Sequence, residues 1–334
     1  MKRLSLATLL ISLLLLIATS RAFADAPAAT RSAATRSAAT QASRAFLWHI
    51  TTADGKPAGS LVGSVHLATE DFYPLPDVFY SSFDAADRLV VEVDITKVDQ
   101  GAMQQMVLKS GMYAPPDGLS KHVAKETMDA LKAYGKFPAE LTEQMKPWLL
   151  ATMITMQEIQ ALGFDPNLGI DQHFLAKAAE TKKKVVELET AEAQFKLLSG
   201  FDAKLQEKFL SGTLSDMKEL KPTMDKVATA WTTGDAEMIE KELIEKSIER
   251  NPELKPVMVK LFDDRNAAMA SKIDAMIKKG EKPFVVVGAG HLVGEKGLVK
   301  LLAKKGYKIE QATVAATVAP TTKPASSQPA GSGR

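Results

Sequence analysis

The chain has 334 residues, 46% of them hydrophobic and 25% charged, which is the composition of an ordinary globular protein with one large domain or two modest ones. It contains no cysteine, so neither a disulfide framework nor a lipid-modified cysteine is available, and stability must come from packing. The formal net charge is only +2, which gives no indication of nucleic acid or an anionic membrane surface as a partner.

The first 24 residues have the pattern of a cleaved signal peptide. Lys2 and Arg3 precede an apolar run from Leu4 to Ala18, and small residues follow at Ala22 and Ala24, where an export peptidase cuts. A membrane anchor is less favoured, because the run is short for a bilayer span of about 20 residues. Cleavage removes three of the 42 basic residues and no acidic one. The pattern predicts an exported protein, periplasmic or secreted, with no stable membrane span.

Both ends of the remaining chain are low in complexity. Residues 25–43 repeat Arg-Ser-Ala-Ala-Thr, and residues 315–334 carry three prolines among Thr, Ser, Ala and Gly. Such compositions cannot bury enough apolar surface to offset the entropy lost on ordering. We therefore predict a linker at 25–43, a disordered tail at 315–334 and a folded unit at 44–314.

Within this unit, short Val-rich runs bounded by Gly, Pro or charged residues predict strands. They are Phe46–Thr51, Ser60–Val65, Arg88–Val93, Lys184–Leu188, Pro283–Val287 and Tyr307–Ala312. Residues 97–180 and 190–280 show helical spacing, and their methionines fit core positions better than soft-metal ligands. The fold class expected is α/β, with a central mixed sheet covered by helices and large helical insertions that form a helical layer or subdomain.

Two short stretches more than two hundred residues apart are nearly the same. Leu61–His66 and Val286–His291 each run from an apolar strand into Gly-x-x-His, so both deliver an imidazole just past the carboxyl end of a strand. In an open α/β sheet, ligands and catalytic groups gather at that edge. The pair predicts one shared site.

An acidic residue stands in a matching place on a third strand. Glu92, like Asp94, lies near the end of the run Arg88–Val93, and its carboxylate would complete a set with His66 and His291. Two imidazoles and a carboxylate, with positions left for water and substrate, are typical of a divalent transition-metal site. The glycines beside the histidines allow close approach of a ligand, but they also fit an ordinary strand-to-loop turn.

The other histidines differ in interest. His49 in the first strand and His122 at the start of a polar helix are expected to have surface or packing roles. His173 follows Asp171 at the beginning of a helix, which puts an acid and an imidazole two positions apart. The alternative for Asp171 is a helix N-cap.

These residues stand in motifs that resemble the TraB/GumN family, over about Phe46 to Thr313. The motifs occur in the family's order: Gly63-Ser-Val-His66, Leu89-Val-Val-Glu92-Val-Asp94, Lys146-Pro-Trp148, Gly169-Ile-Asp171-Gln-His173, Leu188-Glu189-Thr190 with Gln194, Arg265-Asn266 and Gly288-Ala-Gly-His291-Leu-Val-Gly294. The resemblance implies an α/β domain related to the Tiki-type metalloproteases, whose paired Gly-x-x-His motifs and acidic residue are tied to divalent-metal peptide hydrolysis.

By motif match, His66, Glu92 and His291 would hold the cofactor, a divalent ion such as Mn²⁺, Co²⁺ or Zn²⁺, and the substrate would be a peptide or protein. Glu189 is expected as a proton acceptor.

The remaining matched residues have less defined roles. His173, oriented by Asp171, is the other candidate proton acceptor. Arg265 would meet a substrate carboxylate or the developing oxyanion, or else be a solvated or ion-paired side chain on its helix.

Two other function classes stay open. A binding protein would hold haem, a metal ion or a peptide at the same sheet edge, using His66 and His291 without needing Glu92. A structural or interaction protein of the envelope draws support only from the low-complexity ends. Zincins and serine hydrolases are poorly supported, because there is no His-Glu-x-x-His and no nucleophile elbow. The oligomeric state is not predicted.

Overall fold

The computed structural model describes residues 43–250, 252 and 255–314. The predicted signal peptide at 1–24, the predicted tail at 315–334 and the predicted linker up to residue 42 lie outside the described residues. The predicted folded unit at 44–314 coincides with nearly all of the described part.

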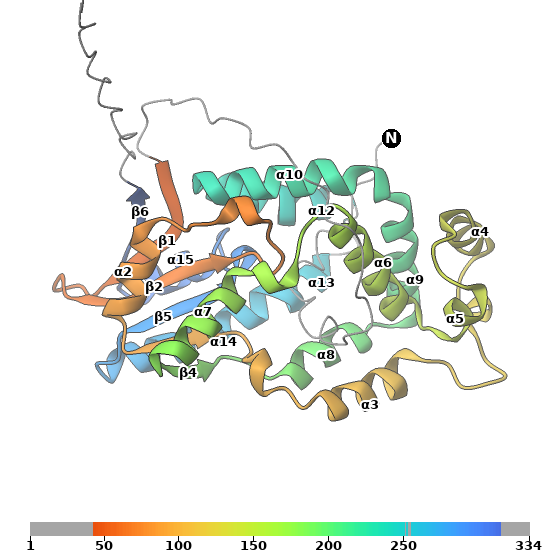
Figure 1. The fold of residues 1–334 in the computed structure, drawn as a ribbon, viewed down its shortest axis with the longest axis horizontal. Helices are drawn as coiled ribbons and strands as arrows, with labels where there is room; N and C mark the ends of the chain where they lie inside the picture. Colours follow the sequence, from red (N-terminus) through yellow and green to blue (C-terminus); the bar gives the residue numbers. More distant parts are fainter. Residues whose placement is uncertain (1–42, 251, 253–254, 315–334) are drawn as a thin grey trace, which may run out of the picture.

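A six-stranded sheet forms the centre of the fold, in the order β4-β3-β5-β2-β1-β6 (Figure 1). All six predicted strands are present, with bounds that shift by a few residues. They are β1 (Ser43–Thr51), β2 (Pro57–Ser64), β3 (Arg88–Val91), β4 (Lys184–Glu187), β5 (Pro283–Gly288) and β6 (Lys308–Val314).

The sheet is mixed, as expected. The neighbouring strands β2, β5, β3 and β4 run parallel, whereas β1 is antiparallel to both β2 and β6. In the parallel part, Ser64 of β2 pairs with Gly288 of β5, and Val91 of β3 pairs with Val286. The carboxyl ends of three adjacent strands therefore meet at one edge.

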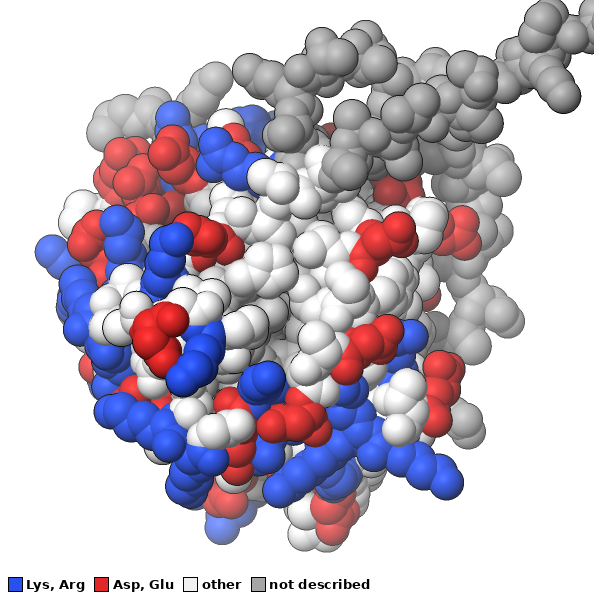
Figure 2. Space-filling view, turned by 90° about the vertical axis from the view of Figure 1, so that its left-hand side faces the viewer, with Lys and Arg blue, Asp and Glu red and all other residues white. Residues whose placement is uncertain are grey.

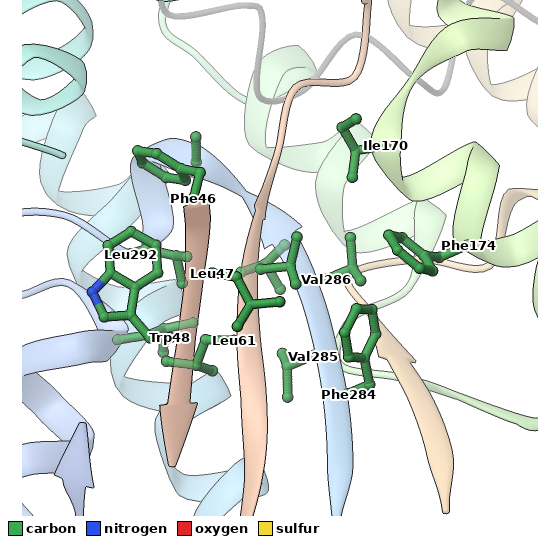
Figure 3. Close-up of a cluster of buried hydrophobic side chains, with 14 of the residues drawn as sticks. Phe46, Leu47, Trp48, Leu61, Ile170, Phe174, Phe284, Val285, Val286 and Leu292 are labelled. Atoms are coloured by element: carbon green, nitrogen blue, oxygen red, sulfur yellow. The ribbon is translucent and has the colours of Figure 1, made fainter. Parts of the chain in front are cut away.

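Helices cover the sheet. They are α2 (Asp77–Ala85), α7 (Ile170–Thr181), α10 (Met217–Thr233), α14 (Asp264–Lys278) and α15 (Leu298–Lys304). Every residue of β5 is buried, so both faces of the central sheet are covered, which explains why its sequence is apolar without alternation. Figure 3 shows Phe174 of α7 packed over Phe284 of β5, and their ring centroids lie 4.7 Å apart.

The long helical regions of the sequence form a layer beyond the carboxyl end of the sheet, on the right of Figure 1. It contains α3 (Gln100–Gly111), α4 (Lys125–Tyr134), α5 (Ala139–Gln144), α6 (Pro147–Ala161), α8 (Ala191–Ser199) and α9 (Ala203–Ser215). A chain of short elements leads from α10 to α14: α11 (Ala236–Glu240), α12 (Lys246–Arg250), α13 (Lys255–Met258) and the π-helical segments Lys241–Glu245 and Val259–Asp263. The expected helical layer is confirmed.

Two hydrophobic cores hold these parts together. One surrounds the sheet and includes Phe46 and Trp231, and the other lies within the helical layer around Trp148 and Phe262. Methionines belong to both cores, including Met145 and Met258 in the second, as expected from their helical spacing.

The face at the sheet end of the molecule carries mixed charge. Figure 2 shows Lys and Arg side chains interspersed with Asp and Glu around an uncharged area, without a large field of one sign on the visible part. Across the described residues, the helices are too short or too polar to span a bilayer.

Candidate functional site

The three predicted ligands lie where the parallel strands end. His66 comes two residues after β2, Glu92 directly follows β3, and His291 ends a short 3₁₀ helix, Ala289–His291, that continues from β5. All three are buried: their exposed fractions are 4%, 6% and 0%. Sheet topology thus gathers residues that are far apart in the sequence, as the Gly-x-x-His pair predicted.

Gly288, the last residue of β5, shows how closely the three side chains converge. A methyl group built on its Cα would lie 3.2 Å from Glu92 Oε1, 3.4 Å from His66 Nε2 and 3.5 Å from His291 Cδ2. His291 Nε2 itself lies 3.7 Å from Glu92 Oε1. The three groups therefore surround one small region next to a residue that has no side chain.

His66 is oriented by the start of α7. Asp171 Oδ1 lies 3.1 Å from His66 Nδ1 and accepts a second hydrogen bond from the Ser64 hydroxyl at 2.8 Å. The helix begins against the end of β2, where a β-carbon on Gly169 would lie only 2.6 Å from the His66 carbonyl oxygen. The N-cap of α7 is Gly169, so the alternative of Asp171 as an N-cap is wrong.

His291 is oriented by the first turn of α14. Its Nδ1 lies 2.6 Å from Asn266 Oδ1, and the Asn266 amide nitrogen donates to the Lys296 carbonyl at 2.9 Å. Asn266 belongs to the Arg265-Asn266 motif, but the sequence alone predicts no role for it. Its position one residue beyond a candidate site arginine was the available signal.

Glu92 is held from three directions. Its Oε1 accepts from the Gly288 backbone N–H at 2.6 Å, and its Oε2 accepts from Arg265 at 2.6 Å and from Gln194 at 2.9 Å. Gln194 lies near the start of α8, which begins where the Thr190 side chain caps the Ala193 N–H. Gln194 also belongs to one of the family motifs, but the sequence alone predicts no role for it.

Glu189 lies beside Glu92 because the chain after β4 continues the pairing with β3: the Glu189 N–H donates to the Glu92 carbonyl at 2.8 Å. Both Glu189 carboxylate oxygens accept hydrogen bonds from Arg265, at 2.6 to 3.0 Å, and Gln194 donates to Oε2 at 3.0 Å. Both of its carboxylate oxygens are thus held by neighbouring side chains, and its role as a proton acceptor stays a prediction.

Arg265 is ion-paired, as one of its two interpretations proposed. The guanidinium is only 6% exposed, and it bonds Glu92, Glu189 and the Leu261 carbonyl. With these partners on its nitrogens, Arg265 is a buried counter-ion of Glu92 and Glu189.

The expected pairing of Asp171 with His173 is not what the structure shows. Asp171 turns toward His66, whereas the His173 ring packs against Tyr73 and Tyr80 at centroid distances of 5.2 and 5.7 Å. Side chains two positions apart on a helix point in different directions, which explains why Asp171 and His173 do not pair. His49 and His122 are exposed, in agreement with their expected surface roles.

Burial and neighbouring charge perturb the titration of the three convergent groups. Burial raises the pKa of Glu92, but His291, Arg265 and His66 outweigh it and lower the pKa to about 2. Burial lowers the pKa of His291 to about 3, against the opposing effect of Glu92. Burial also lowers the pKa of His66, but Asp171 and Glu92 reverse the effect and leave that pKa raised. Glu92 is therefore ionised and His291 neutral near pH 7.

Two histidine nitrogens at the site are free of hydrogen bonds within the described part of the chain. His66 Nε2 and His291 Nε2 are both buried and without a hydrogen-bond partner in the described part of the chain, while each Nδ1 is held by a neighbour. This is the usual arrangement of metal-binding histidines, whose second nitrogen is fixed by a carboxylate or carbonyl. The described side chains do not, however, form a ready cluster of three or more His, Asp or Glu ligands. The metal site remains a prediction.

Comparison with known proteins identifies the family. The model of the TraB/PrgY/gumN family matches residues 46–311. The chain is similar to the uncharacterized protein YbaP of Shigella flexneri and to that of Escherichia coli (strain K12), each 25% identical over 257 residues, or 75% of this chain and 90% of the relative. No solved structure matches. Because the family model spans the sheet, the helical layer and every candidate site residue, the chain belongs to the TraB/PrgY/gumN family.

Proposed function

We propose that this protein is a metal-dependent hydrolase that cleaves peptide bonds, with His66, Glu92 and His291 as the metal ligands. The observation that carries the proposal is the pair of buried, unpartnered Nε2 atoms that converge with Glu92 beside Gly288. Leaving two buried imidazole nitrogens unsatisfied is costly, so a ligand that accepts their lone pairs is the simplest account. Peptide as the substrate class rests on the resemblance of the same motifs to the Tiki-type metalloproteases.

The chemistry that a bound Mn²⁺, Co²⁺ or Zn²⁺ ion supplies is Lewis-acid activation of water and of the scissile carbonyl. The protein's own groups prepare the site for it. Asp171 and Asn266 fix the two imidazoles, and Arg265 with the Gly288 N–H keeps Glu92 ionised and stationary. Metal binding requires both imidazoles to be deprotonated; together with the Glu92 carboxylate they then carry one negative charge in total, which suits a dication.

Glu189 and Gln194 complete this arrangement from the helical side. Glu189 accepts hydrogen bonds from Arg265 and Gln194, and Gln194 also donates to Glu92 Oε2, so the two residues fix the guanidinium and the Glu92 carboxylate relative to each other. We infer that their contribution to hydrolysis is positional. The pattern of a leader at residues 1–24 supports action outside the cytoplasm, in a periplasm or after secretion.

The test uses the full chain, stripped with a chelator and reloaded separately with Mn²⁺, Co²⁺ or Zn²⁺. Cleavage of a mixed peptide library is followed by mass spectrometry. The double variant His66→Ala/His291→Ala is the negative control, and His122→Ala is the matched control, because it removes an exposed histidine that belongs to none of the site motifs. Cleavage that returns with metal in the wild type and in His122→Ala, but not in the double variant, supports the proposal.

A binding protein is the second candidate, and the deep burial of the site favours it. His291 is 0% exposed, as in a centre that retains a ligand without exchanging substrate. Metal uptake without cleavage of any peptide would support this candidate. The variant Glu92→Gln separates the two further, since it abolishes hydrolysis if Glu92 ligates a catalytic ion, whereas a haem absorption band that persists in the variant indicates a haem binder.

A further inference from the structure

Asn266 is a buried amide held at both of its ends. It is 2% exposed, its Oδ1 lies 2.6 Å from His291 Nδ1, and its Nδ2 donates to the Lys296 carbonyl at 2.9 Å. A carbonyl oxygen can only accept, so the amide nitrogen must face Lys296. The amide oxygen is therefore fixed toward His291.

This orientation determines the tautomer of His291. An amide oxygen accepts and does not donate, so His291 Nδ1 carries the hydrogen in the bond between them. A neutral imidazole protonated on Nδ1 has its lone pair on Nε2, the atom that faces Glu92.

The surroundings of Asn266 make this arrangement rigid. Asn266 lies in the first turn of α14, directly after the π-helical segment Val259–Asp263. The turn that contributes the Lys296 carbonyl is tied to the same place a second time, because the Lys296 ammonium pairs with Asp263 at 2.7 Å. The Phe262 ring lies 5.2 Å from the His291 ring and packs over the short helix that carries it.

We propose that Asn266 is a positioning residue that locks His291 in the Nδ1–H tautomer and so presents Nε2 as a lone-pair donor to the ion. The inference deepens the proposed function and rests on it only for the identity of the ligand. The two histidines of the paired motifs are thus prepared differently: His66 by the Asp171 carboxylate, and His291 by a neutral amide whose direction is set by a backbone carbonyl.

The tautomer is measurable without any metal or activity. The chain contains five histidines, so long-range ¹⁵N–¹H correlation spectra of the full-length, metal-free, ¹⁵N-histidine-labelled protein at pH 8 resolve each ring. Loss of one ring's signals in His291→Gln assigns the residue. The wild type is expected to show a protonated Nδ1 and a pyridine-type Nε2 for His291. A protonated Nε2 would overturn the inference.

Three variants test the role of the amide. Asn266→Leu removes the acceptor, so a large share of His291 should move to the Nε2–H tautomer and the affinity for Co²⁺ should fall by about 10- to 100-fold. Asn266→Asp keeps an acceptor for His291 Nδ1, although it replaces the donor to the Lys296 carbonyl with an oxygen and adds a negative charge, so His291 should keep its hydrogen on Nδ1. Asn167→Leu is the control, because that amide bonds Asp165 and no histidine.

The outcomes separate this inference from the proposed function. A folded Asn266→Leu protein that keeps the wild-type tautomer, or an Asn266→Asp protein that loses it, contradicts the role of Asn266. If the tautomers are as expected but the wild type takes up no metal, Asn266 still determines the tautomer of His291. That result would refute the proposed metal site instead. If Asn266→Leu does not fold, the spectra of the wild type and of Asn266→Asp still show whether His291 carries its hydrogen on Nδ1.

Discussion

Adding one methyl group at Gly288 is expected to block the site while leaving the fold intact. The backbone of Gly288 has φ −49° and ψ 138°, which any residue adopts, so alanine introduces no backbone strain. What alanine meets is the site itself: its Cβ would lie 3.2 Å from Glu92 Oε1 and 3.4 Å from His66 Nε2. The substitution therefore probes the space that the convergent groups surround.

The cost in stability follows from how firmly the neighbours are held. Contacts of 3.2 to 3.4 Å require a shift of a few tenths of an ångström, and Glu92 is fixed by Arg265 and by the Gly288 N–H itself. Overpacking of this kind costs about 1–3 kcal/mol, and loss of glycine's freedom in the unfolded chain returns about 0.4–1 kcal/mol. We expect a net loss of about 1–2 kcal/mol in the free energy of unfolding.

Isothermal titration calorimetry of the metal-free protein with Co²⁺ measures the loss of binding. Urea unfolding measures the loss of stability separately. Gly288→Ala should unfold in a single transition at a slightly lower urea concentration and show no measurable Co²⁺ binding. Gly101→Ala in the exposed first turn of α3 is the control: its Cβ would lie 3.3 Å from the capping Asp99 Oδ1, so binding should stay at the wild-type level and the free energy of unfolding should change by less than about 1 kcal/mol. Wild-type affinity in folded Gly288→Ala would refute the convergence of the three groups on a ligand.

Three further outcomes are expected. Arg265→Met leaves Glu92 buried without its counter-ion and should lower the free energy of unfolding, measured in urea, by about 3–5 kcal/mol. The double variant Arg265→Met/Glu92→Gln should lose less stability than the sum of the losses in the two single variants. Additive losses would contradict an interaction between Arg265 and Glu92. In the metal-free protein, the pKa of His291 is about 3 when folded and 6.5 as the unfolded reference, so only the unfolded chain takes up this proton as the pH falls below 6.5. This residue should therefore lower stability by up to about 1.4 kcal/mol per pH unit as the pH falls from 6.5 to about 5.5, before the unfolded chain begins to protonate Glu92 around its reference pKa of 4.5, and urea midpoints for His291→Gln should lack this slope. His173→Gln should bind Co²⁺ with wild-type affinity, because the His173 ring packs against aromatic rings; a loss of binding would return His173 to the site.

Most of the fold was predictable because its signals are local. The six strands are recognisable in the sequence as short apolar runs bounded by Gly, Pro or charged residues. β5 is apolar on both faces because helices cover both faces of the sheet. The order of the strands in the sheet could not be predicted from local sequence signals. Nothing local in Arg88–Val91 specifies that it pairs with β5 rather than with β2, since pairing depends on which helices fill the space between them.

The strand-end residues of the site could be found for the same reason, and their partners could not. His66, Glu92 and His291 each follow an apolar strand, a position that itself indicates function in an α/β sheet. Asn266 and Gln194 lie on helices, where a polar residue usually faces solvent. Only the packing of α8 and α14 against the sheet edge shows that they face inward.

The position of the site between the two hydrophobic cores explains its unusual content of buried charge. Val65 belongs to the core around the sheet and Leu67 to the core of the helical layer, so His66 lies on the boundary between them. Charged groups cannot be satisfied inside either core, but at such a boundary each layer supplies partners: Glu92 comes from the sheet and Gln194 from the helical layer. The helical layer is thus part of the site, because without it Glu92 would lose a hydrogen-bond donor and the sheet edge would lie open to solvent.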